Sequence, residues 1–204
     1  MQTQRTDTTG IRLSDMRVAI VGGIGTGKSA VMKILESLGA NTIYTDKLNK
    51  ELLEDKEYIS LISSTFSNVV YNNKIDKGAL RNLIINDEVS RLKLNSIAHP
   101  RIIDKINDLT AQEGLYFVEI PLLKAVANMI KFDKICFVTA CDEVRQQRIV
   151  LRDKVSLDDA KKIIQSQQAE KEVALIADYV VVNDGDLESL RIQVTKMFEQ
   201  CLIG

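Results

Sequence analysis

The sequence has no excess of positive charge. It contains 27 lysines and arginines against 28 aspartates and glutamates, so its formal net charge at pH 7 is −1. Proteins that bind nucleic acids usually carry a basic excess or a dense basic stripe. The pair Lys161-Lys162 is too short to supply one. We therefore expect no nucleic-acid partner.

Long apolar runs are also missing. The longest apolar stretch extends from Phe117 to Ile130 and is interrupted by Glu119 and Lys124, so no segment is predicted to cross a bilayer. Residues 1–16 are polar and lack the apolar core of a signal peptide, which predicts a flexible N-terminal extension. We expect a cytoplasmic protein without a membrane partner.

Cysteine, histidine and proline are scarce. The three cysteines are an odd number without a CxxC pair, which favours a reducing compartment, and Cys136 is predicted to be a buried thiol. With a single histidine, the sequence shows no cluster of metal-ligating side chains. Two prolines and ten glycines exclude a long disordered or fibrous tract. A globular domain of ordinary size remains.

Short apolar segments rich in β-branched residues alternate with longer helical patterns. The segments predicted to be strands are residues 17–22, 41–44, 115–120, 134–139 and 179–182. Such alternation implies right-handed crossovers and a parallel sheet covered on both faces. We predict an α/β fold with a five-stranded parallel sheet flanked by helices.

Two regions interrupt this alternation. Residues 47–114 are nearly all helical in pattern, apart from Val69 to Tyr71, and are too long for one crossover, so we predict an inserted helical subdomain. Residues 145–172 carry two helical patterns split near 153–156, where Ser156 and Asp159 resemble a capping box. We interpret this region as a helical lid. The core then comprises residues 17–46, 115–144 and 177–204.

A phosphate-binding motif lies between the first strand and the helix predicted over residues 27–38. The segment Gly22 to Ser29 (GGIGTGKS) matches G-x-x-x-x-G-K-[ST] and has the strand–helix context that a P-loop requires. Backbone amides and the helix N-terminus would surround the phosphates of ATP, Lys28 would reach the β and γ oxygens, and Ser29 would bind Mg²⁺. The predicted ATP-binding residues here are Gly23, Ile24, Gly25, Thr26, Gly27, Lys28, Ser29 and Ala30.

The remaining motifs favour a kinase over a GTPase. The N-K-x-D and D-x-x-G motifs of GTPases are missing from the sequence. Asp46 follows the second strand, and the carboxyl ends of parallel strands meet at one edge of a sheet, so Asp46 is a candidate catalytic base beside the P-loop. The alternative is that Asp46 caps a helix beginning at Lys47. Glu119, at the end of the third strand, could hold a water of the Mg²⁺ shell or orient Lys28, or it could be an exposed acid.

Arg148 and Arg152 are spaced i, i+4 at the start of the predicted lid and share one helix face. They could clamp phosphoryl oxygens, or they could belong to a solvated, salt-bridged face. His99 precedes Pro100, which we expect to open the next helix. A lone histidine is more often structural than catalytic.

In order and spacing, these motifs resemble the dephospho-CoA kinase family from about Met16 to Met197. The family's D-A-D corresponds to Tyr44-Thr45-Asp46, which retains only the second acid. The other matching segments are GGIGTGKS, His99-Pro100, Glu119 to Leu123, Arg148 to Asp153, Gln167, and Ala177 to Asn183. The departures are Tyr44, Lys124, Ala125, and Arg145 at the position of a common lid glutamine.

The resemblance implies ATP- and Mg²⁺-dependent phosphorylation of the ribose 3′-hydroxyl of dephospho-CoA, the last step of coenzyme A biosynthesis. It implies catalytic roles for Asp46, Lys28 and Arg148. The helical insert would accept dephospho-CoA, with Asp46, His99 and Glu119 at the acceptor. The lid would close over ATP through Arg148 and Arg152, and Asn183 would lie near the adenine.

Two alternatives stay open at this point. One is a P-loop kinase for another small hydroxyl acceptor, such as a nucleoside or nucleotide. The other is a nucleotide-binding regulatory paralogue without turnover, which Tyr44, Lys124 and Ala125 would favour. Retention of Asp46 argues for an active enzyme. We expect a monomer or a weak oligomer.

Overall fold

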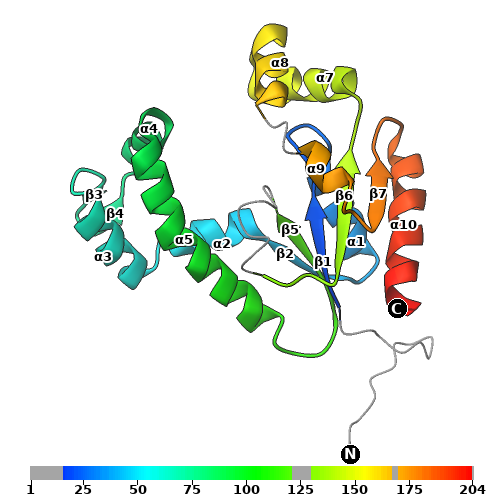
Figure 1. The fold of residues 1–204 in the computed structure, drawn as a ribbon, viewed down its shortest axis with the longest axis horizontal. Coiled ribbons are helices and arrows are strands. Elements are labelled where there is room, and N and C mark those ends of the chain that lie inside the picture. The colour runs from blue at the N-terminus through cyan, green and yellow to red at the C-terminus, as the bar shows by residue number, and fades with distance from the viewer. Residues whose placement is uncertain (1–15, 121–129, 167–169, 204) are drawn as a thin grey trace, which may run out of the picture. The chain divides into compact units, whose positions relative to one another are not determined.

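The computed structural model describes residues 16–120, 130–166 and 170–203 (Figure 1). The chain divides into two compact units. One contains the residues up to Ile43 and from Gln112 onward, and the other runs from Tyr44 to Ala111. Within the described residues, no helix is long and apolar enough to cross a membrane.

The first unit is built on a five-stranded sheet. Its strands are β1 (Met16–Val21), β2 (Asn41–Tyr44), β5 (Leu115–Ile120), β6 (Lys134–Thr139) and β7 (Tyr179–Val182). They are ordered β2-β5-β1-β6-β7, and β1 pairs in parallel with β5 and β6, as β6 does with β7. Val18, Ala19 and Ile20 in the central strand are fully buried, because both faces of the sheet are covered. The predicted parallel sheet is confirmed.

Helices α1 (Lys28–Ser37) and α10 (Leu187–Ile203) pack against each other in this unit. Helix α1 buries Val31, Ile34 and Leu35 along one stripe, as its periodicity predicts. Cys136 in β6 is fully buried, as expected, and burial raises the pKa of its thiol.

The predicted lid consists of α7 (Asp142–Asp153), α8 (Leu157–Gln165) and the short α9 (Glu170–Ala174). Helix α7 ends at Asp153, and the capping residue Lys154 has a left-handed φ of 55°. The Ser156 hydroxyl accepts from the Asp159 amide at 3.1 Å and donates to the Asp159 carboxylate at 2.7 Å. The predicted break and the predicted helix start at Ser156 are therefore confirmed. The Asp159 carboxylate bonds the Ser156 hydroxyl and not the Ser156 backbone amide, so the reciprocal bond of a capping box is not recorded among the described residues.

The second unit is helical apart from one hairpin. It contains α2 (Thr45–Leu52), α3 (Lys56–Thr65), β3 (Val70–Tyr71), β4 (Lys74–Ile75), α4 (Lys77–Asn86) and α5 (Glu88–Leu109). Asn72 and Asn73 both have positive φ, as a tight hairpin turn requires. The aspartates that precede α3, α4 and α5 each accept a hydrogen bond from an amide of the first turn. The helical character predicted for this insert is confirmed.

The prediction that Pro100 opens a helix is wrong, because Pro100 lies inside the long helix α5. Proline removes one backbone hydrogen bond from a helix interior. However, Ala98 precedes Pro100 and Ile102 and Ile106 follow it, and all three are buried. Packing on both sides of the proline therefore holds the helix continuous.

Candidate active site

The loop between β1 and α1 has the backbone shape of a phosphate-binding turn. Gly25 and Gly27 have φ values of 77° and 93°, a region that favours glycine. A Cβ at Gly25 would lie 2.9 Å from the carbonyl oxygen of Arg145, and a Cβ at Gly27 would overlap the side-chain amide of Asn183. Both glycines are therefore required by conformation and by close neighbours.

Side chains of the loop itself bind its first two carbonyls. The Lys28 ammonium group donates to the carbonyl oxygens of Gly22 at 2.5 Å and Gly23 at 3.2 Å. The buried Thr26 hydroxyl also donates to Gly23, at 2.9 Å. The Ala30 amide donates to Gly27 and so begins the backbone ladder of α1, beside the exposed Ser29. Lysine, hydroxyl and helix N-terminus thus occur together, as the motif predicts.

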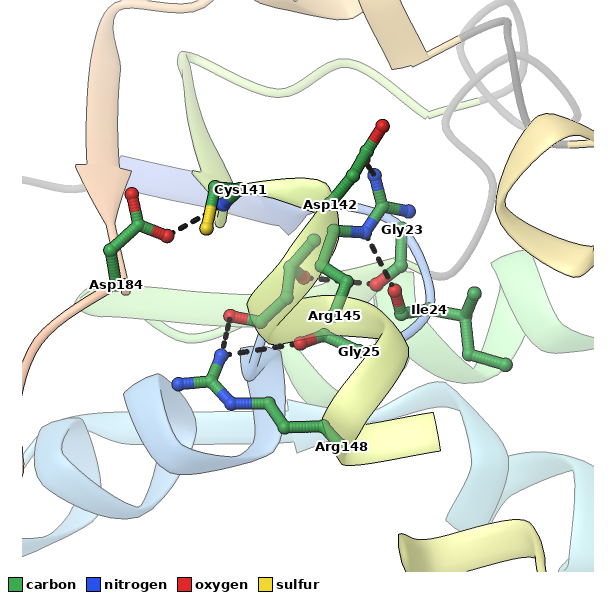
Figure 2. A network of polar contacts seen from close by, with 9 residues as sticks. Gly23, Ile24, Gly25, Cys141, Asp142, Arg145, Arg148 and Asp184 are labelled. Carbon is green, nitrogen blue, oxygen red and sulfur yellow. Dashed lines mark hydrogen bonds and ion pairs between the residues drawn. The ribbon is translucent and has the colours of Figure 1, made fainter. Parts of the chain in front are cut away.

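Two arginines of α7 bind the next carbonyls of the loop (Figure 2). The Arg145 Nε donates to the Ile24 carbonyl oxygen at 3.0 Å, and Arg148 Nη1 donates to that of Gly25 at 3.2 Å. Arg145 is only 6% exposed, and its guanidinium also lies 3.6 Å from the carboxylate of Asp142. From the sequence, Arg145 is distinguished only as a departure from the family. Its i, i+3 spacing from Arg148 was the one signal that could have placed it on the same helix face.

Asn183 follows β7 and completes this network. Its backbone amide donates to Thr139 at 2.8 Å, and its side-chain amide donates to the Thr26 carbonyl oxygen at 2.9 Å. Its own carbonyl oxygen accepts from Arg148 Nη2, also at 2.9 Å. The buried Asn183 therefore lies beside the C-terminal half of the loop. Its contact with adenine stays a prediction.

The structure does not bring Arg152 to the loop. Its guanidinium donates to both carboxylate oxygens of Asp153, each at 2.8 Å, and its side chain is 60% exposed. The arginine lowers the pKa of the Asp153 carboxyl through these hydrogen bonds. Arg152 thus forms the salt-bridged helix face that was its alternative interpretation, and its binding to ATP stays a prediction.

Asp46 is the second residue of α2, directly after β2, and it is exposed. The helix begins at Thr45 with Tyr44 in the capping position, so the interpretation of Asp46 as a helix cap is wrong. Thr45, the first residue of the helix, is buried, and Asp46 lies on the surface. Its role as a catalytic base stays a prediction.

Glu119 is half-buried near the end of β5, where it is in register with Ile20 of β1. His99 is half-buried in α5, and burial lowers the pKa of its imidazole, which favours the neutral form. Asp46 and His99 belong to the Tyr44–Ala111 unit, whereas Lys28 and Glu119 belong to the other unit. That these residues meet around an acceptor stays a prediction. The motif residues Pro121 to Leu123, the departures Lys124 and Ala125, and Gln167 lie outside the described residues.

Residues 16–189 match the family model described as dephospho-CoA kinase. The chain belongs to the dephospho-CoA kinase family. A relative named dephospho-CoA kinase in Fusobacterium nucleatum is 34% identical over 92% of this chain and 99% of its own length. Membership of the dephospho-CoA kinase family makes the chain a kinase, that is, a phosphotransferase.

Solved structures agree with this family. Dephospho-CoA kinase from Campylobacter jejuni has a TM-score of 0.63 at 27% identity, covering 92% of this chain and 98% of that one. TT1252 from Thermus thermophilus has a TM-score of 0.80 at 28% identity, covering 94% of this chain and 100% of that one. The predicted P-loop fold of the dephospho-CoA kinase family is therefore confirmed.

Proposed function

We propose that the chain transfers the γ-phosphoryl group of ATP to the ribose 3′-hydroxyl of dephospho-CoA, giving CoA and ADP. Given the family, the observation that carries this proposal is the pattern of hydrogen bonds to the backbone of the P-loop. Its carbonyl oxygens from Gly22 to Thr26 all accept hydrogen bonds from side chains. Over the described part of the chain, the amides of Gly25 and Gly27 have no recorded acceptor. Such amides form a concave site that suits phosphate oxygens.

The residues around the loop supply the charge that phosphoryl transfer requires. Lys28 stabilises the β and γ oxygens. Arg148 lies one turn after Arg145 on α7 and stabilises the charge that develops on the leaving oxygen. Asp46 orients the acceptor hydroxyl and takes its proton late in transfer.

The Ser29 hydroxyl suits Mg²⁺, because it is exposed at the start of α1 and has no recorded hydrogen bond among the described residues. Mg²⁺ bound with ATP would neutralise charge on the phosphates. Ser29 would hold this ion, and the phosphates would lie among Gly23, Ile24, Gly25, Thr26, Gly27 and Ala30.

We assign the acceptor to the helical unit. This unit contains a cavity of about 940 Å³ between α3, the β3–β4 hairpin and the start of α4. Its walls combine three cations, Lys56, Lys74 and Lys77, and one acid, Glu54, with serine hydroxyls and apolar side chains. No ion pair of these three lysines is recorded within the described ranges. A cavity with free cations and an apolar part suits an elongated acceptor that carries a diphosphate.

We further propose a cytoplasmic protein that is a monomer or a weak oligomer.

The test is ADP release from ATP and Mg²⁺ with dephospho-CoA as acceptor, with the product identified by mass. Adenosine, nucleotides and water serve as competing acceptors in parallel reactions. We expect one phosphoryl group on the ribose 3′-oxygen of dephospho-CoA. Phosphate on another acceptor, or release of free phosphate alone, would contradict the proposal. ATP binding without any turnover would instead favour the regulatory alternative.

A further inference from the structure

Arg145 is the one charged side chain among the described buried residues. It is held against the P-loop in two ways. Its Nε donates to the Ile24 carbonyl oxygen at 3.0 Å. The backbone of α7 at Arg145 also lies so close to Gly25 that a Cβ there would come within 3.1 Å of the Arg145 Cα. Burying a charged guanidinium costs free energy, because the group loses its contact with water. Packing alone does not explain a buried charge at this position, so we look for a function of its contact with the loop.

The bond to Ile24 determines the direction of one amide. The peptide unit is planar, and all described peptide bonds are trans, so the Gly25 N–H points opposite to the Ile24 C=O. By holding this carbonyl on the α7 side, Arg145 directs the Gly25 amide away from α7. This amide has no recorded acceptor within the described residues. It belongs to the concave group of amides that we assign to the phosphates.

Arg148 and Asn183 hold the carbonyl oxygens of the following peptide units in the same way. Arg148 binds the Gly25 carbonyl oxygen, and Asn183 binds that of Thr26. Arg145 extends this support by one residue toward the N-terminal half of the loop, where neither of the others reaches. Its Nη1 also lies 3.6 Å from the Asp142 carboxylate, which holds the guanidinium in place.

We infer that Arg145 is a positioning residue for nucleotide binding, which acts by orienting the Gly25 amide through the Ile24 carbonyl. The inference rests on the proposed binding of ATP by this loop. In this role Arg145 acts through the Ile24 carbonyl and not by binding the phosphates itself. It keeps one of their amide donors in the binding orientation, so that ATP binding does not have to reorganise the peptide unit.

The test compares Arg145→Met, which removes the donor but fills a similar volume, with Arg145→Gln, whose amide can donate to Ile24 without a charge. The dissociation constant of ATP should rise about tenfold in Arg145→Met, as expected for loss of a hydrogen bond from a charged donor. Arg145→Gln should recover most of this affinity. The KM for dephospho-CoA and the kcat at saturating ATP should change much less than the ATP affinity in both variants.

The Gly25 amide gives a direct signature. Its ¹H–¹⁵N resonance in glycine-labelled protein should shift in Arg145→Met and return toward the wild-type position in Arg145→Gln. Arg191→Met is the matched control, because Arg191 is exposed on α10 and its recorded contact is one long hydrogen bond, 3.4 Å, to Ser37. It should leave the ATP affinity and the Gly25 resonance unchanged. Thermal unfolding of each variant reports whether it is folded.

Two results would overturn the inference: wild-type ATP affinity in a folded Arg145→Met variant, or no recovery in a folded Arg145→Gln variant. The second would mean that Arg145 contributes charge or packing instead of orientation. Failure of the proposed function is separate, because it would appear as wild-type protein that binds ATP without phosphorylating dephospho-CoA. Wild-type protein that does not bind ATP would contradict both.

Discussion

The P-loop and the helix starts of the helical unit are stabilised by contacts that span very different lengths of sequence. In the P-loop, the bond from Arg145 to Ile24 spans 121 residues of sequence and that from Asn183 to Thr26 spans 157. In the helical unit, the caps of α3 and α4 join Asp55 to Tyr58 and Asp76 to Ala79, each three residues apart. The loop therefore depends on the whole sheet and on α7, whereas local sequence is enough to start the helices of the insert.

This difference has a functional consequence. A loop whose carbonyls are held from distant elements presents amides in a defined direction, and loss of a single donor affects the chemistry directly. A cavity lined by exposed lysines binds through charges that solvent and salt screen, so its substitutions should have graded effects. The following predictions test this contrast.

Lys28→Ala should have the largest effect, in the nucleotide unit. We expect kcat/KM for ATP to fall roughly 10³-fold, the upper range for loss of one preorganised donor. The Lys28 ammonium group also donates to the Gly22 and Gly23 carbonyl oxygens. The substitution therefore removes a cation and also two hydrogen bonds that support the loop. Steady-state kinetics and ATP titration measure the change. Lys33→Ala, an exposed position on the same helix, is the control; near-wild-type turnover in Lys28→Ala would mean that the loop binds something else.

Asp46→Asn should affect chemistry without affecting nucleotide binding. The substitution keeps size and removes charge, so kcat should fall by roughly 10²-fold or more, the range for a positioned base, while the dissociation constant of ATP stays the same. Asp104→Asn, exposed on α5 in the same unit, should leave both quantities unchanged. An unchanged kcat in Asp46→Asn would remove Asp46 from the mechanism.

Arg148→Ala and Arg152→Ala compare two arginines on one helix face that have different partners. Arg148 binds the loop, so Arg148→Ala should lower kcat about tenfold or more, beyond its effect on ATP affinity, as expected for loss of a charged donor. Arg152 is paired with Asp153 and exposed, so its effect should have the same direction and a smaller size. Equal losses in the two variants would show that both arginines reach the phosphates during turnover.

Lys74→Ala with Lys77→Ala tests the cavity of the helical unit. The double variant should raise the KM for dephospho-CoA by roughly threefold to tenfold, because exposed charges contribute little each and are screened by salt. The increase should shrink at high ionic strength, and the ATP affinity should not change. Lys93→Ala, exposed on α5 and outside the cavity lining, is the control. An unchanged KM would place the acceptor elsewhere.

Ser156→Ala should have the smallest effect and no effect on chemistry. Loss of the cap that starts α8 should lower the free energy of unfolding by about 1 kcal/mol. Urea unfolding measures this, and KM values should stay the same. Ser166→Ala, where the hydroxyl only donates to the Ile163 carbonyl at the end of α8, should cost less. A larger loss at Ser166 would contradict the capping interpretation.

Local patterns in the sequence were enough to predict the elements whose causes are local. The run of β-branched residues in β1, the glycines of the loop and the helix cap at Ser156 each act over a few residues, and the structure confirms them. The helical insert was recognised for the same reason. The order of motifs along the chain was sufficient to identify the family.

Tertiary structure decided the rest, because its causes lie far apart in the chain. Pro100 stays inside a helix because buried residues on both sides hold it there, against the local preference of proline. Arg145 is part of the site because α7 packs on Gly25. Arg152 lies on the same helix but donates to the Asp153 carboxylate instead. Periodicity places a side chain on a helix face, but only the packed fold determines which carbonyl its donors can reach.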